Sequence, residues 1–331
     1  MKRNVGIIGA GSWGTALALL LDRNGHHVTL WSYNKKEVDE LNKTRIHEKK
    51  LPGVQIPESI TITDKLKSAI DKKDFVIMAV PSIKTRETAR KMRDYVDEGQ
   101  IIVNVSKGIE EKTLMTLSQQ IEEELPWSIV TVLSGPSHAE EVSRGIPTTC
   151  VIGSDDEEVA KELQDAFMSN EFRVYTSSDV LGIELGGSLK NVIALAAGAA
   201  DGLGYGDNTK AALITRGIAE ITRLGVAMGG KAETLSGLAG IGDLIVTCAS
   251  QHSRNRKAGC LIGQGYSMEE AMKEVKMVVE GVYSAKAALE LSKKYNISMP
   301  IVEKVNEVLF EGKDSKTAVN ELMLRDGKSE Y

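Results

Sequence analysis

The sequence predicts an α/β domain with a doubly wound, largely parallel sheet, followed by a domain made only of helices. Three observations support this fold class. Short apolar runs alternate with helix-like stretches over the first half of the 331 residues, and the first run leads through a glycine-rich turn into a helix. After about residue 179, strand-like runs nearly vanish. Because alternating strands and helices are typical of a parallel sheet covered on both faces, we expect one domain over residues 1–179 and a second, α-helical domain over 180–331.

The chain opens with a strand, a glycine turn and a helix in direct succession. An apolar strand is expected over Val5–Ile8, and the sequence GAGSWG follows it. In this context the G-x-G-x-x-G spacing indicates a Rossmann-type dinucleotide site. Gly9 permits a tight turn, Gly11 lets the backbone approach a pyrophosphate, and Gly14 lets the helix pack on the strand. The N–H groups at the start of the helix favour phosphate binding. A plain tight turn is the alternative.

The same stretch also resembles a secretory signal peptide, because a basic start precedes a long apolar segment. Against this, the glycines have phosphate-binding spacing, and a second strand over Val28–Trp31 follows as a βαβ unit requires. The sequence turns polar at Asp22 without a small-x-small cleavage site. We therefore expect this segment to remain in the mature protein as part of the fold.

The remaining elements are expected in the same alternating pattern. Each strand of the first half ends in polar residues, often with glycine, at the side of the sheet where such folds bind ligands. Strands are expected at 75–80, 101–105, 129–133, 149–152 and 173–176, with helices at 85–97 and 114–124. Helices of the second domain are expected at 180–200, 211–224, 268–274, 284–295 and 301–309. The C-terminal residues 325–331 are expected to be loose.

Composition excludes several classes of function. The net charge of −5 gives no reason to expect nucleic-acid binding, which favours a basic surface. Apart from the N-terminal stretch, no apolar run approaches the ~20 residues of a membrane span, so no stable membrane insertion is expected. Three scattered cysteines without a C-x-x-C pair suit a reducing compartment and supply no zinc site, and the five histidines lack metal-ligand spacing. We expect a cytoplasmic protein without a metal.

The residues after the second strand carry no acid. An NAD-specific site usually has Asp or Glu there for the ribose hydroxyls, whereas this chain has Tyr33 and Asn34, followed by Lys35 and Lys36. The two lysines either attract the 2′-phosphate of NADP or belong to a solvated charged loop, and the residues leave both interpretations open.

Two lysines have surroundings that suit proton transfer. A dehydrogenase acting on an alcohol needs a group that takes the hydroxyl proton while hydride leaves the same carbon. Lys107 follows the strand expected at 101–105, beside the predicted cofactor crevice, and Lys190 interrupts an otherwise apolar helix. An ammonium inside an apolar helix must find polar partners or remain solvated.

A third cluster follows in the helical domain. Asp243 comes after two glycines and before an apolar run, and it either anchors a buried lysine or caps a helix. Ser253, Arg254 and Asn255 supply hydroxyl, guanidinium and amide donors in succession, a good set for a phosphate. A helix N-cap with exposed polar neighbours is the alternative, and the residues alone favour it.

Long motifs identify the family. GAGSWGTALA, VSKGIE, LSGPSHAEEV, ELGGSLKNVIALAAGAADGLGYGDNTKAALITRG, SGLAGIGDLIVTC, HSRN and MVVEGV resemble, in this order, the bacterial type of NAD(P)-dependent glycerol-3-phosphate dehydrogenase. The match runs from Val5 to about Leu322. It implies reversible reduction of dihydroxyacetone phosphate to sn-glycerol 3-phosphate by NADPH or NADH, which supplies phospholipid synthesis, and it implies a homodimer.

The resemblance also assigns roles. Lys190 is the implied proton acceptor for the C2 hydroxyl, Asp243 holds it, and Lys107 touches substrate and cofactor. The remaining substrate residues are implied to be Gly135, Ser137, Ser253, Arg254 and Asn255. The cofactor residues are implied to be Ser12, Trp13, Ala139, Arg254, Val278 and Glu280, beside Gly9, Gly11 and Gly14. Where the family usually has arginine after the second strand, this chain has Tyr33 and Asn34. Tyr33 preserves stacking on adenine, and the preference between NADPH and NADH stays open.

Two other functions are consistent with part of the sequence. A dehydrogenase of β-hydroxyacids or sugar acids shares a Rossmann domain, a helical domain and a helix-borne lysine, but it needs a carboxylate clamp rather than a phosphate cluster. A non-catalytic NAD(P)-binding regulator needs the first domain and has no use for Lys190, Asp243 and Arg254 together.

Overall fold

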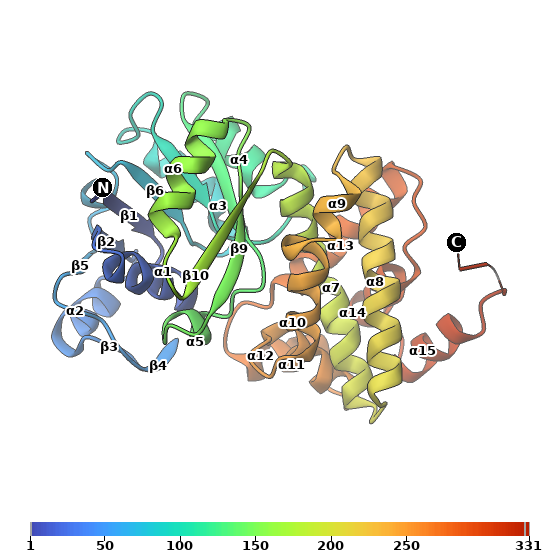
Figure 1. Ribbon diagram of the computed structural model, residues 1–331. Helices are drawn as coiled ribbons and strands as arrows, with labels where there is room; N and C mark the ends of the chain where they lie inside the picture. Colours follow the sequence, from blue (N-terminus) through green and yellow to red (C-terminus); the bar gives the residue numbers. More distant parts are fainter. Residues whose placement is uncertain (1, 328, 331) are drawn as a thin grey trace. The chain divides into compact units, whose positions relative to one another are not determined.

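A computed structural model describes residues 2–327, 329 and 330, and it divides the chain into two compact units (Figure 1). The first consists of Met1–Lys107 and Met115–Glu184, and the second of Gly108–Leu114 and Leu185–Tyr331. The first unit contains the sheet and the second is helical, which confirms the predicted fold class. The functional division at residues 179 and 180 stays a prediction. Of the C-terminal segment expected to be loose, Lys328 and Tyr331 lie outside the described residues.

The first unit is built on an eight-stranded sheet in the order β10-β9-β8-β7-β6-β1-β2-β5. Neighbouring strands pair in parallel except β8 and β9, which are antiparallel. The strands are β1 Asn4–Ile8, β2 His27–Trp31, β5 Thr61–Thr63, β6 Phe75–Met78, β7 Ile101–Asn104, β8 Ile129–Ser134, β9 Thr148–Gly153 and β10 Phe172–Ser177. β3 (Ile46–His47) and β4 (Leu51–Gln55) form a separate antiparallel pair. The sequence predicted each long parallel strand to within two residues and missed the short β3, β4 and β5.

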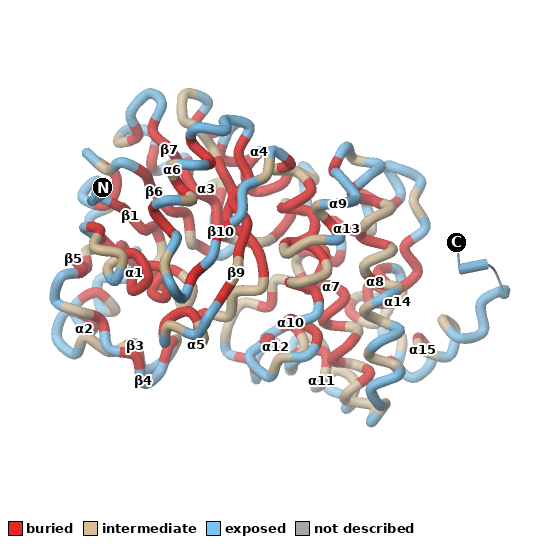
Figure 2. Tube along the Cα trace, in the orientation of Figure 1, coloured by how far each residue is buried: buried red, intermediate tan, exposed pale blue. Residues whose placement is uncertain are grey.

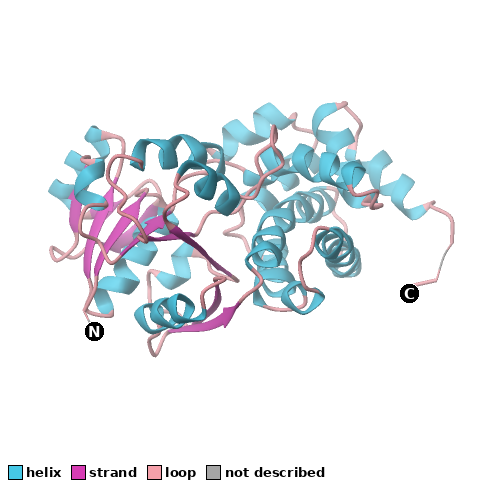
Figure 3. Cartoon of the chain, turned by 90° about the horizontal axis from the view of Figure 1, so that it is seen from above, coloured by secondary structure: helices cyan, strands magenta, loops and turns pink. Residues whose placement is uncertain are grey.

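Helices cover both faces of this sheet, as Figure 3 shows. On one face α1 (Ser12–Arg23) and α6 (Glu157–Phe167) contribute buried leucines, alanines and Phe167 to the core. On the other, α3 (Thr85–Met92) and α4 (Leu117–Glu124) pack against the side chains of the alternate strand positions. Strands buried on both sides need continuous apolar runs, which is why their sequences lack polar alternation. α2 (Lys35–Thr44) and α5 (Ala139–Val142) complete the unit.

The register brings the ends of four strands to one edge of the sheet. Met78 at the end of β6 pairs with Asn104 at the end of β7, and Asn104 pairs with Val132 near the end of β8. Ile8 at the end of β1 pairs with Met78. The turns that follow these strands therefore lie side by side at the carboxyl edge, where parallel sheets bind ligands.

The second unit is an assembly of helices around α7. The helices are α7 Val180–Gly202, α8 Asp207–Ala227, α9 Ala232–Leu235, α10 Asp243–Ala249, α11 Arg254–Gly263, α12 Met268–Val275, α13 Glu280–Lys294, α14 Pro300–Phe310 and α15 Ser315–Met323. The first residues of α7 belong to the first compact unit and the rest to the second. Figure 2 shows α7 buried along most of its length.

The expectation that only the N-terminal stretch approaches the length of a membrane span was wrong. Among the described residues, Val180–Gly202 and Ala232–Ala249 are long and apolar enough by length and composition. The apolar window of α7 is 83% buried inside the protein, so its hydrophobicity is that of a core helix.

α7 and α11 touch through their backbones at reciprocal glycines. A Cβ atom on Gly198 would lie 2.1 Å from the carbonyl oxygen of Arg256, and one on Gly259 would lie 2.1 Å from that of Leu195. Gly202 and Gly263, one turn further along each helix, make the same kind of approach. Because only glycine leaves room for such contact, these four residues determine how closely α11 approaches α7.

Candidate active site

The glycine turn of the first unit has the geometry of a phosphate cradle. Gly9 has φ +122°, and a Cβ there would lie 2.6 Å from the carbonyl oxygen of Ala79. A Cβ on Gly14 would lie 1.9 Å from the carbonyl oxygen of Gly9, so the helix packs directly on the turn. A Cβ on Gly11 would meet no described atom within 4 Å, so the backbone at this position faces open space. The turn therefore fits a dinucleotide pyrophosphate at Gly11.

The start of α1 presents polar backbone groups to the same space. Gly11 is the N-cap and contributes no side-chain hydrogen bond, and the first turn of α1 carries no acidic residue. Its first N–H groups and the positive end of the helix dipole thus remain for an anion. Ser12 donates a 2.6 Å hydrogen bond to the carbonyl oxygen of Lys50, and Trp13 packs partly buried against the core.

The structure gives the residues after β2 unequal roles. Tyr33 is 82% exposed, so its ring is accessible for stacking. Asn34 is the N-cap of α2 and accepts hydrogen bonds from the backbone N–H groups of Lys36 and Glu37. The ammonium of Lys35 contacts both carboxylate oxygens of Asp39, at 3.0 and 3.2 Å. Lys36 is exposed and makes no ion pair with a described carboxylate.

One acidic residue near β2 was missed by the sequence reasoning. Glu37, on the first turn of α2, is half-buried and accepts 2.5 Å hydrogen bonds from Ser32 and Lys50. Burial opposes its ionisation, but the hydrogen bonds from Lys50 and Ser32 prevail and lower its pKa. The search at the strand end overlooked it because it lies on the following helix. Its carboxylate is engaged by protein donors.

Three predicted substrate residues meet at the carboxyl edge of the first unit. The ammonium of Lys107 donates to the carbonyl oxygen of Gly135 at 3.1 Å, and the hydroxyl of Ser137 donates to the same oxygen at 2.9 Å. Gly135 has φ +139°, and a Cβ there would lie 3.1 Å from the Cα of Cys150. α5 begins directly afterwards at the buried Ala139.

In the second unit the side chain of Lys190 is almost completely buried, and its ammonium has polar partners. Its ammonium forms an ion pair with the carboxylate of Asp243 and donates to the hydroxyl oxygen of Thr247 at 2.6 Å. Lys190 is 6% exposed and Asp243 1%. An unpaired ammonium at this depth would cost several kcal/mol, and the carboxylate offsets this cost. The apolar helix sequence predicted the need for such a partner.

Thr247 was not among the predicted residues. Its hydroxyl donates a 2.6 Å hydrogen bond to the carbonyl oxygen of Asp243, one turn earlier on α10, and accepts from Lys190. The spacing of four residues after Asp243 is the sequence signal that would have found it, because residues i and i+4 share a helix face.

A single π-helical turn, Leu238–Gly242, precedes α10 and presents Asp243 to α7. A Cβ on Gly186 of α7 would lie 2.6 Å from the carbonyl oxygen of Ala239 in that turn. Turns of this type are frequent at functional sites. The close approach at Gly186, one turn before Lys190, brings the ammonium within reach of the carboxylate. The N-cap of α10 is Gly242, so Asp243 is not the cap that the alternative interpretation supposed.

The start of α11 gathers the predicted phosphate residues. Ser253 is the N-cap and accepts from the N–H of Arg256 at 3.2 Å, so its own hydroxyl hydrogen remains available. Asn255 donates to Oδ1 of Asn191 at 2.9 Å, and its own Oδ1 accepts from the N–H of Gly281 at 2.8 Å. The N-cap interpretation thus holds for Ser253, and it leaves the hydroxyl able to donate.

Arg254 connects this cluster to the segment that carries the two predicted cofactor residues of the second unit. Its guanidinium donates to the carbonyl oxygen of Val278 at 3.0 Å. Val279 caps α13, of which Glu280 is the first residue. Arg254 and Val278 are therefore in direct contact, and Glu280 is adjacent to the Gly281 N–H that Asn255 binds.

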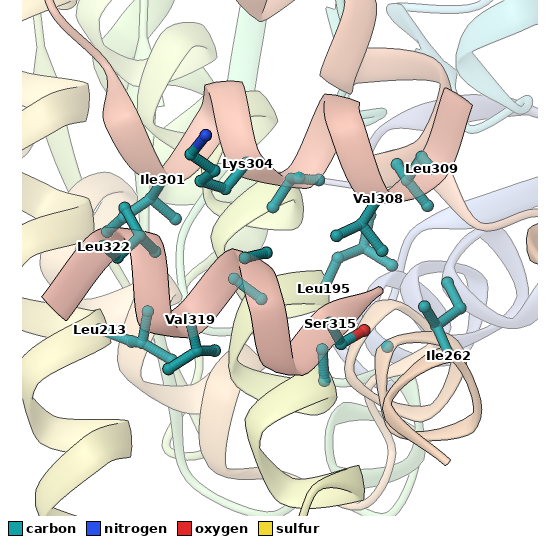
Figure 4. Close-up of a pocket in the computed structure, with 15 residues that line it drawn as sticks. Leu195, Leu213, Ile262, Ile301, Lys304, Val308, Leu309, Ser315, Val319 and Leu322 are labelled. Atoms are coloured by element: carbon teal, nitrogen blue, oxygen red, sulfur yellow. The ribbon is translucent and has the colours of Figure 1, made fainter. Parts of the chain in front are cut away.

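An apolar cavity in the second unit lies away from these residues (Figure 4). It has a volume of about 60 Å³ and is lined by residues of α7, α8, α11, α14 and α15. Lys304 is the one charged side chain among its described lining residues, and no candidate site residue lines it. Its almost entirely apolar lining supplies no set of donors for a phosphate or a dinucleotide.

Comparisons with known proteins agree with this geometry. Residues 4–160 match the N-terminal region, and residues 179–320 the C-terminal region, of the NAD-dependent glycerol-3-phosphate dehydrogenase family. The chain is 65% identical to a glycerol-3-phosphate dehydrogenase (NAD(P)+) of Agathobacter rectalis, over 99% of this chain and 97% of that one. It is 60% identical to that of Fusobacterium nucleatum, over 98% of each. A crystal structure of glycerol-3-phosphate dehydrogenase from Coxiella burnetii superposes with a TM-score of 0.95 at 39% identity, covering 98% of this chain and 99% of that one.

Proposed function

The chain belongs to the NAD-dependent glycerol-3-phosphate dehydrogenase family, and we propose that it reduces dihydroxyacetone phosphate reversibly to sn-glycerol 3-phosphate. The observation that carries the proposal is the buried ammonium of Lys190 against Asp243 and Thr247. NAD(P)H, when bound, supplies the hydride that reaches C2 of the substrate. A carbonyl reduction also needs one proton at the carbonyl oxygen, and the site must supply it.

Lys190 gives this proton in our proposal. Its ammonium has three N–H bonds, of which the described contacts direct one to Asp243 and one to Thr247. In this proposal one N–H bond of the ammonium is directed to the carbonyl oxygen of the substrate when the substrate is bound. As the C2 oxygen gains a proton, Lys190 becomes neutral, and in the reverse direction it takes the proton back. Asp243 holds the ammonium in place and stabilises its charge in an apolar helix.

The substrate phosphate is assigned to the start of α11. The Ser253 hydroxyl, the Arg254 guanidinium and the second N–H of the Asn255 amide are the donors. A guanidinium binds phosphate through paired N–H groups, and a helix N-terminus favours an anion. A carboxylate-binding hydroxyacid dehydrogenase has no need for this set, so its presence supports a phosphorylated substrate.

The cofactor is assigned to the glycine turn and its neighbours. Gly9, Gly11, Gly14, Ser12 and Trp13 would hold the pyrophosphate side, and the exposed ring of Tyr33 would stack on adenine. The remaining proposed contacts are Asn34, Lys107, Ala139, Arg254, Val278 and Glu280. Lys107, Gly135 and Ser137 also contact substrate in this proposal.

We further propose a cytoplasmic homodimer that is not stably inserted in a membrane and supplies glycerophospholipid synthesis. The burial of α7 inside the protein supports its role as a core helix rather than a membrane span. Sedimentation or light scattering of the purified protein tests the dimer, and fractionation of cells tests the location.

The test is oxidation of NADPH and of NADH with dihydroxyacetone phosphate, in wild type and in Lys190→Ala. We expect the variant to bind cofactor normally and to lose at least about 10³-fold in kcat, because only the proton transfer is removed. Lys304→Ala, which removes an ion-paired lysine on α14, is the matched control and should keep full activity. Near wild-type turnover by Lys190→Ala would remove Lys190 from this role. Cofactor binding without turnover in the wild type would favour the hydroxyacid or regulator interpretations.

A further inference from the structure

The loop Asn104–Gly108 carries Lys107 and is shaped by the side chain at its start. Asn104, fully buried at the end of β7, accepts from the N–H of Ser106 at 3.1 Å and donates to the carbonyl oxygen of Ser106 at 3.3 Å. The Ser106 hydroxyl donates to the carbonyl oxygen of Val80 at 2.5 Å. The direction in which the side chain of Lys107 projects from the loop thus depends on the orientation of the Asn104 amide.

Glu184 determines that direction. Its Oε1 accepts from Nδ2 of Asn104 at 3.0 Å and from the N–H of Ser118 at 2.9 Å. If the Asn104 amide were turned over, its oxygen would face the Glu184 carboxylate and the N–H of Ser106 would lose its acceptor. Because Oε1 already accepts from the N–H of Ser118, it presents an acceptor to Asn104, and Glu184 therefore permits one orientation of the Asn104 amide.

Ser188 holds the other end of the loop. Its hydroxyl, 1% exposed, donates to the carbonyl oxygen of Gly108 at 3.1 Å. Ser188 follows Glu184 by four residues on α7, so the two side chains project from the same face of one helix. Each of these hydrogen bonds lies within one of the two compact units.

The position of Glu184 is costly for stability alone. Burial is the main cause that raises the pKa of this carboxyl, although hydrogen bonds from Thr116, Ser118 and Asn104 favour its charged form. No ion pair with a described residue compensates the charge, and Glu184 is 6% exposed. The carboxyl instead gives an acceptor to two buried donors, the Asn104 amide and the Ser118 N–H.

We propose that Glu184 and Ser188 are positioning residues for Lys107, acting by holding both ends of the loop 104–108. The proposal rests on the function proposed above, in which Lys107 contacts substrate and cofactor. Neither residue touches the reacting atoms. Their effect is to place the ammonium of Lys107, and misplacement of a catalytic group by about 1 Å can cost a hundredfold in rate.

The test is a double-mutant cycle with Lys107→Ala, measured as kcat/KM for dihydroxyacetone phosphate. In the wild-type background we expect Ser188→Ala to lose about 3- to 10-fold and Glu184→Leu about 30- to 100-fold. Glu184→Gln should stay within about 3-fold of wild type, because its amide oxygen accepts from the same two donors. In the Lys107→Ala background, each change should lose less than about 2-fold more, because no ammonium remains to be positioned.

Two controls separate positioning from general damage to the fold. Ser284 is 1% exposed, and its hydroxyl has no hydrogen-bond partner among the described residues, so Ser284→Ala removes a buried hydroxyl without breaking a bond. Glu220→Gln alters another buried carboxylate that accepts from backbone N–H groups. Both should keep wild-type kcat/KM. Thermal unfolding of every variant shows which ones remain folded, and Ser188→Ala, which removes one oxygen, keeps the test valid if Glu184→Leu does not fold.

The possible results distinguish the two proposals. A wild type that does not reduce dihydroxyacetone phosphate overturns the proposed function and the positioning role with it. An active wild type whose folded Ser188→Ala and Glu184→Leu variants keep full activity overturns the positioning role alone. Losses of kcat/KM that persist undiminished in the Lys107→Ala background also overturn it, because the substitutions at Ser188 and Glu184 would then act through something other than Lys107.

Discussion

The hydroxyl of Thr247 lies 2.6 Å from the ammonium of Lys190 and donates its own hydrogen to the carbonyl oxygen of Asp243, also at 2.6 Å. This arrangement obliges the hydroxyl oxygen to accept from Lys190, since its single hydrogen is already used. Lys190 is therefore held by two acceptors from adjacent turns of α10. The orientation of the ammonium is therefore fixed by geometry as well as by charge.

We expect Thr247→Val to lower kcat about tenfold with little change in KM. Valine has nearly the same shape, so the main loss is one hydrogen bond to a charged group, of about 1.5 kcal/mol. Steady-state kinetics with dihydroxyacetone phosphate measures the effect, and Thr247→Ser, which keeps the hydroxyl, is the control. An unchanged kcat in Thr247→Val would show that Asp243 alone orients the ammonium.

Gly186→Ala should damage both stability and turnover. The added Cβ would lie 2.6 Å from the backbone oxygen of Ala239, so α7 and the π-helical turn before Asp243 must separate. Overpacking of this kind typically costs about 1–3 kcal/mol, and the separation also lengthens the contact of Lys190 with Asp243. Urea unfolding and kcat measure the two effects. Gly327→Ala, where a Cβ would meet no described atom within 4 Å, should be nearly neutral in both.

The stability of the protein should depend on pH through Glu220 of α8. This carboxylate is 2% exposed and accepts from the N–H groups of Ile301 and Val302 at the start of α14. Burial is the main cause that raises its pKa from 4.5 to about 7, against the opposing effects of these N–H groups and of Arg223. Between pH 4.5 and about 7 the folded state keeps a proton that the unfolded state has lost. Stability therefore falls as pH rises through this range and levels off above it.

Glu220→Gln tests this expectation, because an amide cannot ionise but still accepts. We expect the variant to gain stability relative to wild type as pH rises from 5 to 8, by up to about 3 kcal/mol. Urea unfolding of both proteins at several pH values measures the difference in their free energies of unfolding. The contributions of the other titrating groups are the same in both proteins and cancel in this difference. A difference that does not vary with pH would show that Glu220 does not titrate in this range.

The preference between cofactors should depend on Lys36 more than on Lys35. The ammonium of Lys35 is paired with Asp39, whereas Lys36 is exposed without a described carboxylate partner. If Lys36 meets the 2′-phosphate, Lys36→Ala lowers kcat/KM for NADPH by about 3- to 5-fold and leaves NADH unchanged, as expected of one exposed charge pair. Lys35→Ala is the control. Equal effects on both cofactors would assign Lys36 to the solvated loop.

The comparison of Asp243 with Ser253 shows how far local reasoning reaches. Both were open to interpretation as helix caps, because Asp and Ser are both common at the N-cap position. The cap proved to be Gly242 in one case and Ser253 itself in the other. The difference depends on the π-helical turn before Asp243, which forms through contacts with α7 and α9 and has no local signature. Likewise Glu37 was missed because it lies on α2, and its contacts with Ser32 and Lys50 depend on how α2 packs against the end of β2.

The sequence by itself determined the succession of strands and helices, the glycine turn and the family, because these depend on residue periodicity, on backbone steric limits and on long uninterrupted motifs. It also determined that Lys190 needs a polar partner, since a charge in an apolar helix must be compensated. The tertiary structure alone decided which groups meet it. Thr247 at Lys190, Glu184 at Asn104 and Ser188 at Gly108 are pairs from separate parts of the chain, and hydrogen bonds act only over about 3 Å. Such contacts follow from the packing of whole elements, which no local pattern encodes.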